Sequence, residues 1–367
     1  MVIFGALFLF ASAGAASRSA DYGLLQRFAP QSATTWWAIV QSNLTARTWV
    51  VRTVDSGKHW QDVSAPVKIV ASSAFVGTRA AWIETGALHP GPTQPLYRTL
   101  DGGHVWRVVG SLPSECELDF VDLQHGWCTS IGAATGSETV NLLRTTDGGS
   151  SWALVSHTGL FDKASTIGAL PYACDKTIAF TSPEVGWAAQ YCNGGKPRLW
   201  VSRDSGMHWR ALAPVPLPKR FHPAGEGLSL PALSGSRITV SVDVGGLPHG
   251  ATVIATSQNG GRSWRTQLIP GSPRYWTVDL VDVAHWLVSD GSTLGSTADA
   301  GRHWHSWTPS VRMEDAVGTT LALRSVSPRV GFATPNGNEG PLWWTRDGGG
   351  TWLPIRIHAG PFTVPQS

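Results

Sequence analysis

Aspartate recurs along this chain at a spacing that points to one shared task. Seven eight-residue segments follow, with one substitution, the pattern [Ser/Thr]-x-Asp-x-Gly-x-x-Trp, which we call the box. Carboxylates repeated in this way can act as general acids or bases, ligate a metal, or cap backbone N–H groups in a tight turn. The third box position holds Asp55, Asp101, Asp147, Asp204, Asn259, Asp299 and Asp347.

The residues around these aspartates favour the turn. A Gly two positions after the Asp supplies a positive φ, and the Trp that ends the box can anchor a returning strand. Asn259 replaces the acid in the fifth box but keeps an oxygen that accepts hydrogen bonds. We therefore interpret the box residues as structural parts of hairpins rather than as catalytic groups or metal ligands, and we expect no metal or other cofactor.

The spacing of the boxes predicts the architecture. They recur every 40 to 57 residues, and a second hairpin precedes many of them, most clearly at 118–129 and 178–189. Each repeat therefore reads as four strands, A to D, with the box in the C–D turn. The sequence predicts an all-β, seven-bladed β-propeller of four-stranded antiparallel blades. The expected blades are 24–63, 67–110, 117–156, 177–213, 227–268, 275–308 and 319–358.

Composition agrees with an exported all-β domain. Among 367 residues, 14% are charged, with 41 Gly, 24 Pro and 19 Trp. The net charge of +3, without a dense Lys/Arg run, argues against a nucleic-acid partner. The apolar run at 2–16 ends in small residues, so we expect residues 1–16 to be a signal peptide and 17–367 to be one propeller domain, secreted or otherwise extracytoplasmic. No second apolar run of about 20 residues follows, so no membrane span is expected in the mature chain.

Four cysteines in an exported chain suggest two disulfides, with three possible connectivities. Cys174 and Cys192 bracket a hairpin almost symmetrically, which favours their pairing. Cys116 and Cys128 bracket the neighbouring hairpin less symmetrically and form the second expected pair. The alternative is four free thiols; metal ligation lacks a Cys-x-x-Cys spacing.

Strand order indicates where a binding site would lie. In an up-and-down blade the A–B and C–D turns share one face, so the B–C and D–A connections occupy the opposite face. The longest connections, 156–176 and 212–226, lie there and flank blade four. This sector holds our candidate binding residues, an aromatic and basic set for an acidic protein segment or an anionic glycan: Lys176, Lys196, Arg198, Lys219, Arg220, Phe221, Arg274, Tyr275 and Trp276. The alternative is that these are solvated cations and aromatics packed on the blade tops.

The boxes resemble the Asp-box of the bacterial-neuraminidase-repeat propellers, which include sialidases, sortilin-type receptors, some endoglucanases and photosystem II assembly factors. Seven boxes paired with Gly-Trp hairpins look most like the photosystem II assembly-factor propellers, and this resemblance implies a non-catalytic scaffold that holds a protein partner. The alternative is a glycoside hydrolase of sialidase or glucanase type acting on extracellular glycans. A sialidase carries an Arg-Ile-Pro motif before its first box, and the stretch 27–30, Arg-Phe-Ala-Pro, does not match it. Catalysis is therefore the less favoured reading, although the sequence does not exclude it, and no oligomeric state is indicated.

Overall fold

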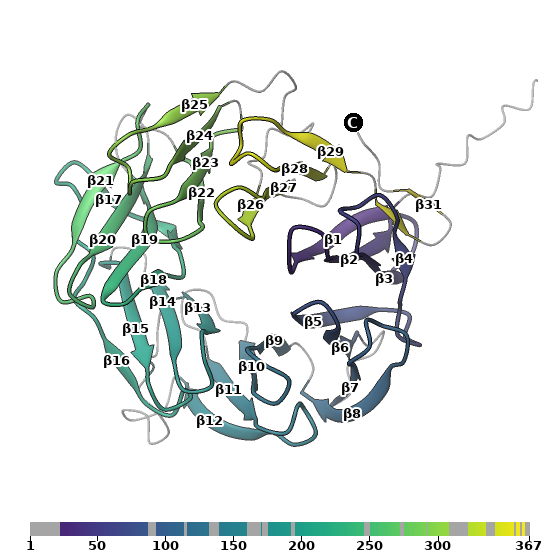
Figure 1. The fold of residues 1–367 in the computed structure, drawn as a ribbon. Coiled ribbons are helices and arrows are strands. Elements are labelled where there is room, and N and C mark those ends of the chain that lie inside the picture. Colours follow the sequence, from purple (N-terminus) through teal and green to yellow (C-terminus); the bar gives the residue numbers. More distant parts are fainter. Residues whose placement is uncertain are drawn as a thin grey trace, which may run out of the picture.

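Seven small antiparallel sheets are arranged as blades around a central axis (Figure 1). The computed structural model describes residues 23–363 except 87–92, 114–115, 132–138, 160–169, 171–174, 192–194, 246–249, 272–274, 292, 308–321, 335–341, 356 and 360–361. The predicted seven-bladed β-propeller is therefore confirmed. The signal peptide expected at 1–16 lies outside the described residues. Within these residues there is no helix with the length and apolar character needed to cross a membrane.

The first four blades each contain four strands in sequence order. Blade one is β1 (Gly23–Pro30), β2 (Trp36–Ser42), β3 (Thr48–Thr53) and β4 (Gln61–Asp62). Blade two is β5 (Val70–Val76), β6 (Ala80–Thr85), β7 (Gln94–Thr99) and β8 (Arg107–Leu112). Blade three is β9 (Cys116–Phe120), β10 (Gly126–Ile131), β11 (Val140–Thr145) and β12 (Ala153–Thr158). Blade four is β13 (Asp175–Phe180), β14 (Gly186–Tyr191), β15 (Arg198–Ser202) and β16 (Trp209–Ala211).

The last three blades follow the same plan, with one addition. Blade five is β17 (His222–Leu228), β18 (Ala232–Ser234), β19 (Arg237–Gly245), β20 (Ala251–Ser257) and β21 (Arg265–Leu268). Blade six is β22 (Thr277–Leu280), β23 (Trp286–Ser289), β24 (Leu294–Thr297) and β25 (His305–Trp307). Blade seven is β26 (Ala322–Ser325), β27 (Gly331–Thr334), β28 (Leu342–Thr345) and β29 (Leu353–Ile355). A short hairpin of β30 (His358–Ala359) and β31 (Phe362–Thr363) ends the described chain.

Blade five departs from the sequence prediction. Its inner position is shared by two strands, because β17 pairs with the end of β19 and β18 pairs with its beginning. The blade therefore starts at His222, and part of the connection expected at 212–226 is strand. Pro223 and Gly227 make this segment look like a loop in the sequence. An edge strand tolerates them, because a Pro there need not donate an N–H to a neighbouring strand and a Gly need not pack a side chain.

Every box forms the same hydrogen-bonded turn. The Ser or Thr hydroxyl at position one donates to the Asp or Asn oxygen at position three over 2.7 to 3.0 Å. That oxygen also accepts the N–H of position seven over 2.9 to 3.0 Å. Position five is always Gly, with φ from 79° to 98°. Position four is also left-handed, and it holds Ser56, Ser205 and Ala300 in three of the boxes.

The position-four N–H joins the two turns of each blade. In all seven blades it donates to a carbonyl in the A–B turn of the same blade, over 2.8 to 3.0 Å; in blade three, for example, Gly148 donates to Gln124. The A–B turns and the boxes therefore share one face of the ring, as the strand order predicts. We call it the box face, and the other side the opposite face.

Apolar side chains fill the spaces between neighbouring blades. The buried residues form seven clusters, one at each interface between consecutive blades and one between blades seven and one. Each box Trp packs against the cluster between its own blade and the preceding one, as Trp152 does between blades two and three and the buried Trp209 does between blades three and four. Burying a large apolar side chain contributes about 1.5–3 kcal/mol, so these clusters are the main cohesive contacts of the ring.

Side-chain packing closes the ring. Phe332 of blade seven lies against Phe28 and Trp36 of blade one, with ring centroids 4.9 and 5.0 Å apart. Arg324 Nη1 donates to the Phe28 carbonyl over 3.1 Å. The β30–β31 hairpin contacts β3 and β4 of blade one, beside the yellow end of the chain in Figure 1. Blades one and seven are each built from consecutive strands, so closure needs no exchanged strand.

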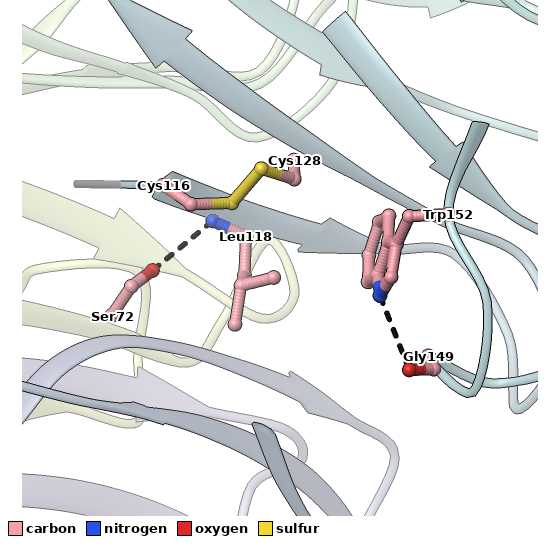
Figure 2. Close-up of a disulfide and its surroundings, with 6 residues drawn as sticks. All are labelled: Ser72, Cys116, Leu118, Cys128, Gly149 and Trp152. Atoms are coloured by element: carbon pink, nitrogen blue, oxygen red, sulfur yellow. Dashed lines mark hydrogen bonds between the residues drawn. A yellow bond between two sulfur atoms is a disulfide. The ribbon is translucent and has the colours of Figure 1, made fainter. Parts of the chain in front are cut away.

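One of the two expected disulfides is present. Cys116 of β9 and Cys128 of β10 are joined, with Cα atoms 5.4 Å apart, and both residues are buried (Figure 2). Beside it, the N–H of Leu118 donates to Ser72 Oγ of blade two over 3.1 Å, and Trp152 Nε1 donates to the Gly149 carbonyl over 3.1 Å. Cys174 and Cys192 lie outside the described residues, so their pairing stays a prediction.

Replacing the box carboxylate should destabilise the blade, whereas an isosteric amide should be tolerated. Asp147 accepts hydrogen bonds from Thr145, Ser150 and Ser151. We expect Asp147→Ala to lower the free energy of unfolding by about 1–2 kcal/mol, as the loss of a capping side chain does. Asp147→Asn should lose less, because Asn259 makes the corresponding bonds in blade five. Urea titration of the three proteins measures this; equal losses in both variants would contradict it.

Acid should remove the stabilising effect of the Asp147 charge on the fold. Its pKa is lowered to about 2, first by the bond from the Ser151 hydroxyl and then by the Ser151 N–H. A carboxyl group with a lowered folded-state pKa stabilises the fold above its ordinary pKa near 3.8, and this contribution is lost as pH falls toward 2. The stability difference between the natural protein and Asp147→Asn should therefore shrink from pH 5 to pH 2. A difference that stays constant over this range would show that the charge of Asp147 does not stabilise the turn.

Candidate functional site

The predicted binding sector lies on the opposite face, around blades four to six. The connection from blade four to blade five runs beside the start of β15, because the N–H of Val215 donates to the Pro197 carbonyl over 2.9 Å. This bond places the connection next to Lys196, which is exposed, and Arg198, which is half-buried at the start of β15. The structure thus brings together residues from two separate parts of the sequence.

A cationic turn projects from this connection. Lys219 and Arg220 are exposed at a turn closed by the bond from the Phe221 N–H to the Pro218 carbonyl, 2.8 Å long. The Arg220 guanidinium lies 4.8 Å from the centroid of the Phe221 ring. Phe221 in turn packs on the cluster between blades four and five. Because the Phe221 ring is anchored, the guanidinium above it holds its positive charge in a restricted position.

Two predicted residues are buried rather than on the rim. Lys176 on β13 is 5% exposed and Trp276 is 8% exposed. The Trp276 N–H donates to Thr252 Oγ1 over 2.9 Å, and its side chain packs in the cluster between blades five and six. Both positions therefore fit the packing alternative better than contact with a partner. Arg274 lies outside the described residues.

Tyr275 is the exposed aromatic of the sector. It is 47% exposed, and its ring lies so close to Gly250 that a Cβ there would collide with the phenol oxygen. Its neighbour Trp276 is held by Thr252, whose hydroxyl also donates to Asp243 Oδ1 over 2.6 Å. Burial raises the pKa of Asp243 to about 6, and the bond from Thr252 opposes this shift. Hydrogen bonds thus hold the residue next to Tyr275 in place.

The inner strands carry a group of charges that the sequence analysis did not single out. Arg27 of β1 lies close enough to Arg324 of β26, and to Glu117 and Asp119 of β9, for their charges to interact. Burial, and then Arg324, lower the pKa of Arg27. Burial likewise raises the pKa of Asp119 and of Asp279 on β22. Short strands separated by about 90 to 300 residues meet here, and no local sequence pattern reports that meeting.

These inner carboxylates take part in contacts between blades. Asp119 Oδ2 accepts the N–H of Phe180 from the next blade over 2.7 Å. Asp279 occupies the equivalent strand position in blade six and faces Ser325 of blade seven. A hydrogen bond committed to the next blade leaves Asp119 less free to exchange a proton with a substrate. Among the described residues, no group of three or more His, Cys, Asp or Glu side chains is placed to hold a metal ion.

Comparison with known proteins finds similarity in fold. No family model and no curated protein matches the chain. A solved structure of YCF48 bound to D1 peptide is 14% identical, with a TM-score of 0.54 over 89% of this chain and 92% of that one. YCF48 from Cyanidioschyzon merolae is 12% identical, with a TM-score of 0.50 over 92% and 97%. Prolyl oligopeptidase B from Galerina marginata is 10% identical, with a TM-score of 0.60 over 93% of this chain but 52% of that one.

The resemblance to photosystem II assembly-factor propellers, predicted from the repeats, is thus confirmed for the architecture. Identities of 10% to 14% show a shared fold and leave function to the site itself.

Proposed function

We propose that the chain is an extracytoplasmic, non-catalytic propeller that holds an acidic segment of a protein partner on its opposite face. The observation that carries the proposal is the cationic turn at 219–221, which is anchored through Phe221. The chain just before this turn is hydrogen-bonded to Pro197, the neighbour of Lys196. Arginine and lysine above an apolar anchor suit carboxylate groups that arrive on an extended peptide.

Two further observations support this proposal. YCF48, which shares the fold, has been solved with a D1 peptide bound, so a propeller of this architecture can accommodate a peptide. The Cys116–Cys128 disulfide and the apolar run at 2–16 are both typical of a protein that matures outside the cytoplasm.

A glycoside hydrolase is the second candidate. The observation in its favour is the pair Glu117 and Asp119, which lie two residues apart on β9 close to Arg27. Paired carboxylates, one of them with a raised pKa, are the groups that glycoside hydrolysis requires. The bond from the Phe180 N–H to Asp119 Oδ2 weighs against this candidate, because it engages one of the two carboxylate oxygens in a contact between blades.

Neutralising the cationic turn should selectively weaken peptide binding. We expect Lys219→Gln/Arg220→Gln to reduce the affinity for capped Asp- and Glu-rich peptides about tenfold, and added salt to reduce the affinity of the natural protein. The matched control is Lys58→Gln/Arg302→Gln, which removes two exposed cations from the box face. Peptide-array binding followed by calorimetry measures both variants, with basic peptides as the reference.

The same preparation distinguishes the two candidates. Hydrolysis of a sialoside or a β-glucan that is lost in Glu117→Gln or Asp119→Asn would support the hydrolase and overturn the scaffold proposal. An equal loss of peptide affinity in the two double variants would show that net charge, rather than the turn at 219–221, governs binding.

A further inference from the structure

The same pair of stacked aromatic rings fills two of the interfaces between blades. Trp82 of blade two stacks on Phe120 of blade three, with centroids 3.9 Å apart, and Trp127 of blade three stacks on Phe180 of blade four at 3.6 Å. Each indole N–H donates to the position-four carbonyl of the next box: Trp82 to Gly148 over 2.9 Å, and Trp127 to Ser205 over 3.0 Å. The stacked rings fill these interfaces, and each indole N–H has a hydrogen-bond acceptor there.

The stacked Phe requires a Gly beside it. Phe120 pairs with Gly126 and Phe180 pairs with Gly186 across the A–B hairpin. A Cβ at either Gly would lie 2.5 Å from the Phe ring. In blade five the corresponding pair is Leu233 and Ile238. Leu233 stands at the position of the Phe and Ile238 at the position of the Gly, so this blade offers no aromatic ring to its neighbour.

The interface between blades four and five is therefore incompletely filled. Trp187 occupies the same strand position as Trp127, yet its buried Nε1 has no hydrogen-bond partner among the described residues, although the side chain is 6% exposed. A cavity of about 380 Å³ lies here, with walls that include Trp187, Val201, Leu212, Leu233 and Gly260. Gly260 is the position-four residue of the next box, the counterpart of Gly148 and Ser205. We call this space the 4–5 cavity.

Two arginines give the 4–5 cavity a charge. Arg203 and Arg210 line it and are exposed, and neither forms an ion pair within the part of the chain that the structure describes. Asp204 lines an adjoining cavity, but its carboxylate is engaged by Ser202 and His208. The corresponding space between blades six and seven, where Leu287 stands in place of the Trp, is a smaller cavity of about 230 Å³ without an arginine in its lining. A missing stack thus leaves space in both places, and the cations distinguish the 4–5 cavity.

We propose that the 4–5 cavity binds a planar aromatic ring that carries or adjoins a carboxylate. The ring occupies the place that Phe120 and Phe180 fill at the other interfaces, and an acceptor on the ligand satisfies the indole N–H of Trp187. The carboxylate meets Arg203 and Arg210, because guanidinium groups bind carboxylates through paired N–H donors. The 4–5 cavity is on the box face, so this site is separate from the sector around Lys219 and does not rest on it.

Titration of the full chain with two probes tests the proposal. Phenylacetate represents a free aromatic acid, and acetyl-Asp-Phe-Asp-amide represents an aromatic side chain in an acidic peptide. With ¹⁵N-labelled tryptophan, the indole resonance of Trp187, assigned from its absence in Trp187→Phe, should shift on titration with at least one probe. Binding of the peptide alone indicates a protein ligand, and binding of phenylacetate indicates a small molecule. If neither probe shifts this resonance at millimolar concentration, the proposal is wrong.

Variants then locate the contacts. Arg203→Gln/Arg210→Gln should weaken binding about tenfold, while Arg302→Gln/Arg346→Gln, which removes two exposed cations from other boxes, should leave it unchanged. Leu233→Phe/Ile238→Gly should fill the 4–5 cavity with the chain's own ring and abolish binding. If this variant does not fold, the arginine variants still decide. Equal affinity in the two arginine variants would overturn the proposal.

Discussion

The backbone of one residue in each box, the residue at position four, connects the elements of the ring. Its N–H donates to the A–B turn of its own blade in all seven repeats. In blades three and four its carbonyl accepts an indole N–H from the preceding blade, and in blade six it accepts Gln267 Nε2 from blade five. The N–H and the carbonyl of this residue are oriented for these bonds because the residue is left-handed and the following Gly has a φ that other residues avoid. The Asp or Asn at position three accepts hydrogen bonds that hold this left-handed pair of residues in place, which accounts for its recurrence.

The interfaces where this scheme is incomplete are the informative ones. Where Trp and Phe stack and the indole N–H is satisfied, the blades pack directly on each other. Substitution of Leu233 and Ile238 for Phe and Gly preserves the strand register but removes the ring, and a cavity results. A repeat protein thus acquires a site through a local departure from its own pattern, while the other interfaces maintain the fold.

The features that recur in every blade could be predicted from the sequence, whereas several features found in only one or a few blades could not. Seven blades, the shared face of the two turns and the Cys116–Cys128 pair all follow from motifs that recur or bracket a hairpin. The split inner strand of blade five did not, since Pro223 and Gly227 resemble a loop and only an edge position permits them in a strand. Left-handed Ser56, Ser205 and Ala300 were also unforeseen, because nothing in their chemistry requires that conformation. The meeting of Arg27 with Asp119 depends on ring closure, which no local pattern encodes.

The candidate binding residues differ in how exposed they are. Lys176 and Trp276 were selected for their type and their position near a connection, yet each follows or precedes a strand residue closely enough to be drawn into the packing. Lys219 and Arg220 belong to a turn outside the sheets, where a cation can stay hydrated, and Phe221 fixes that turn by burying its ring. In a propeller the strand ends are committed to packing between blades. The proposed recognition on the opposite face would therefore depend on residues a few positions beyond the strands, anchored by one apolar side chain.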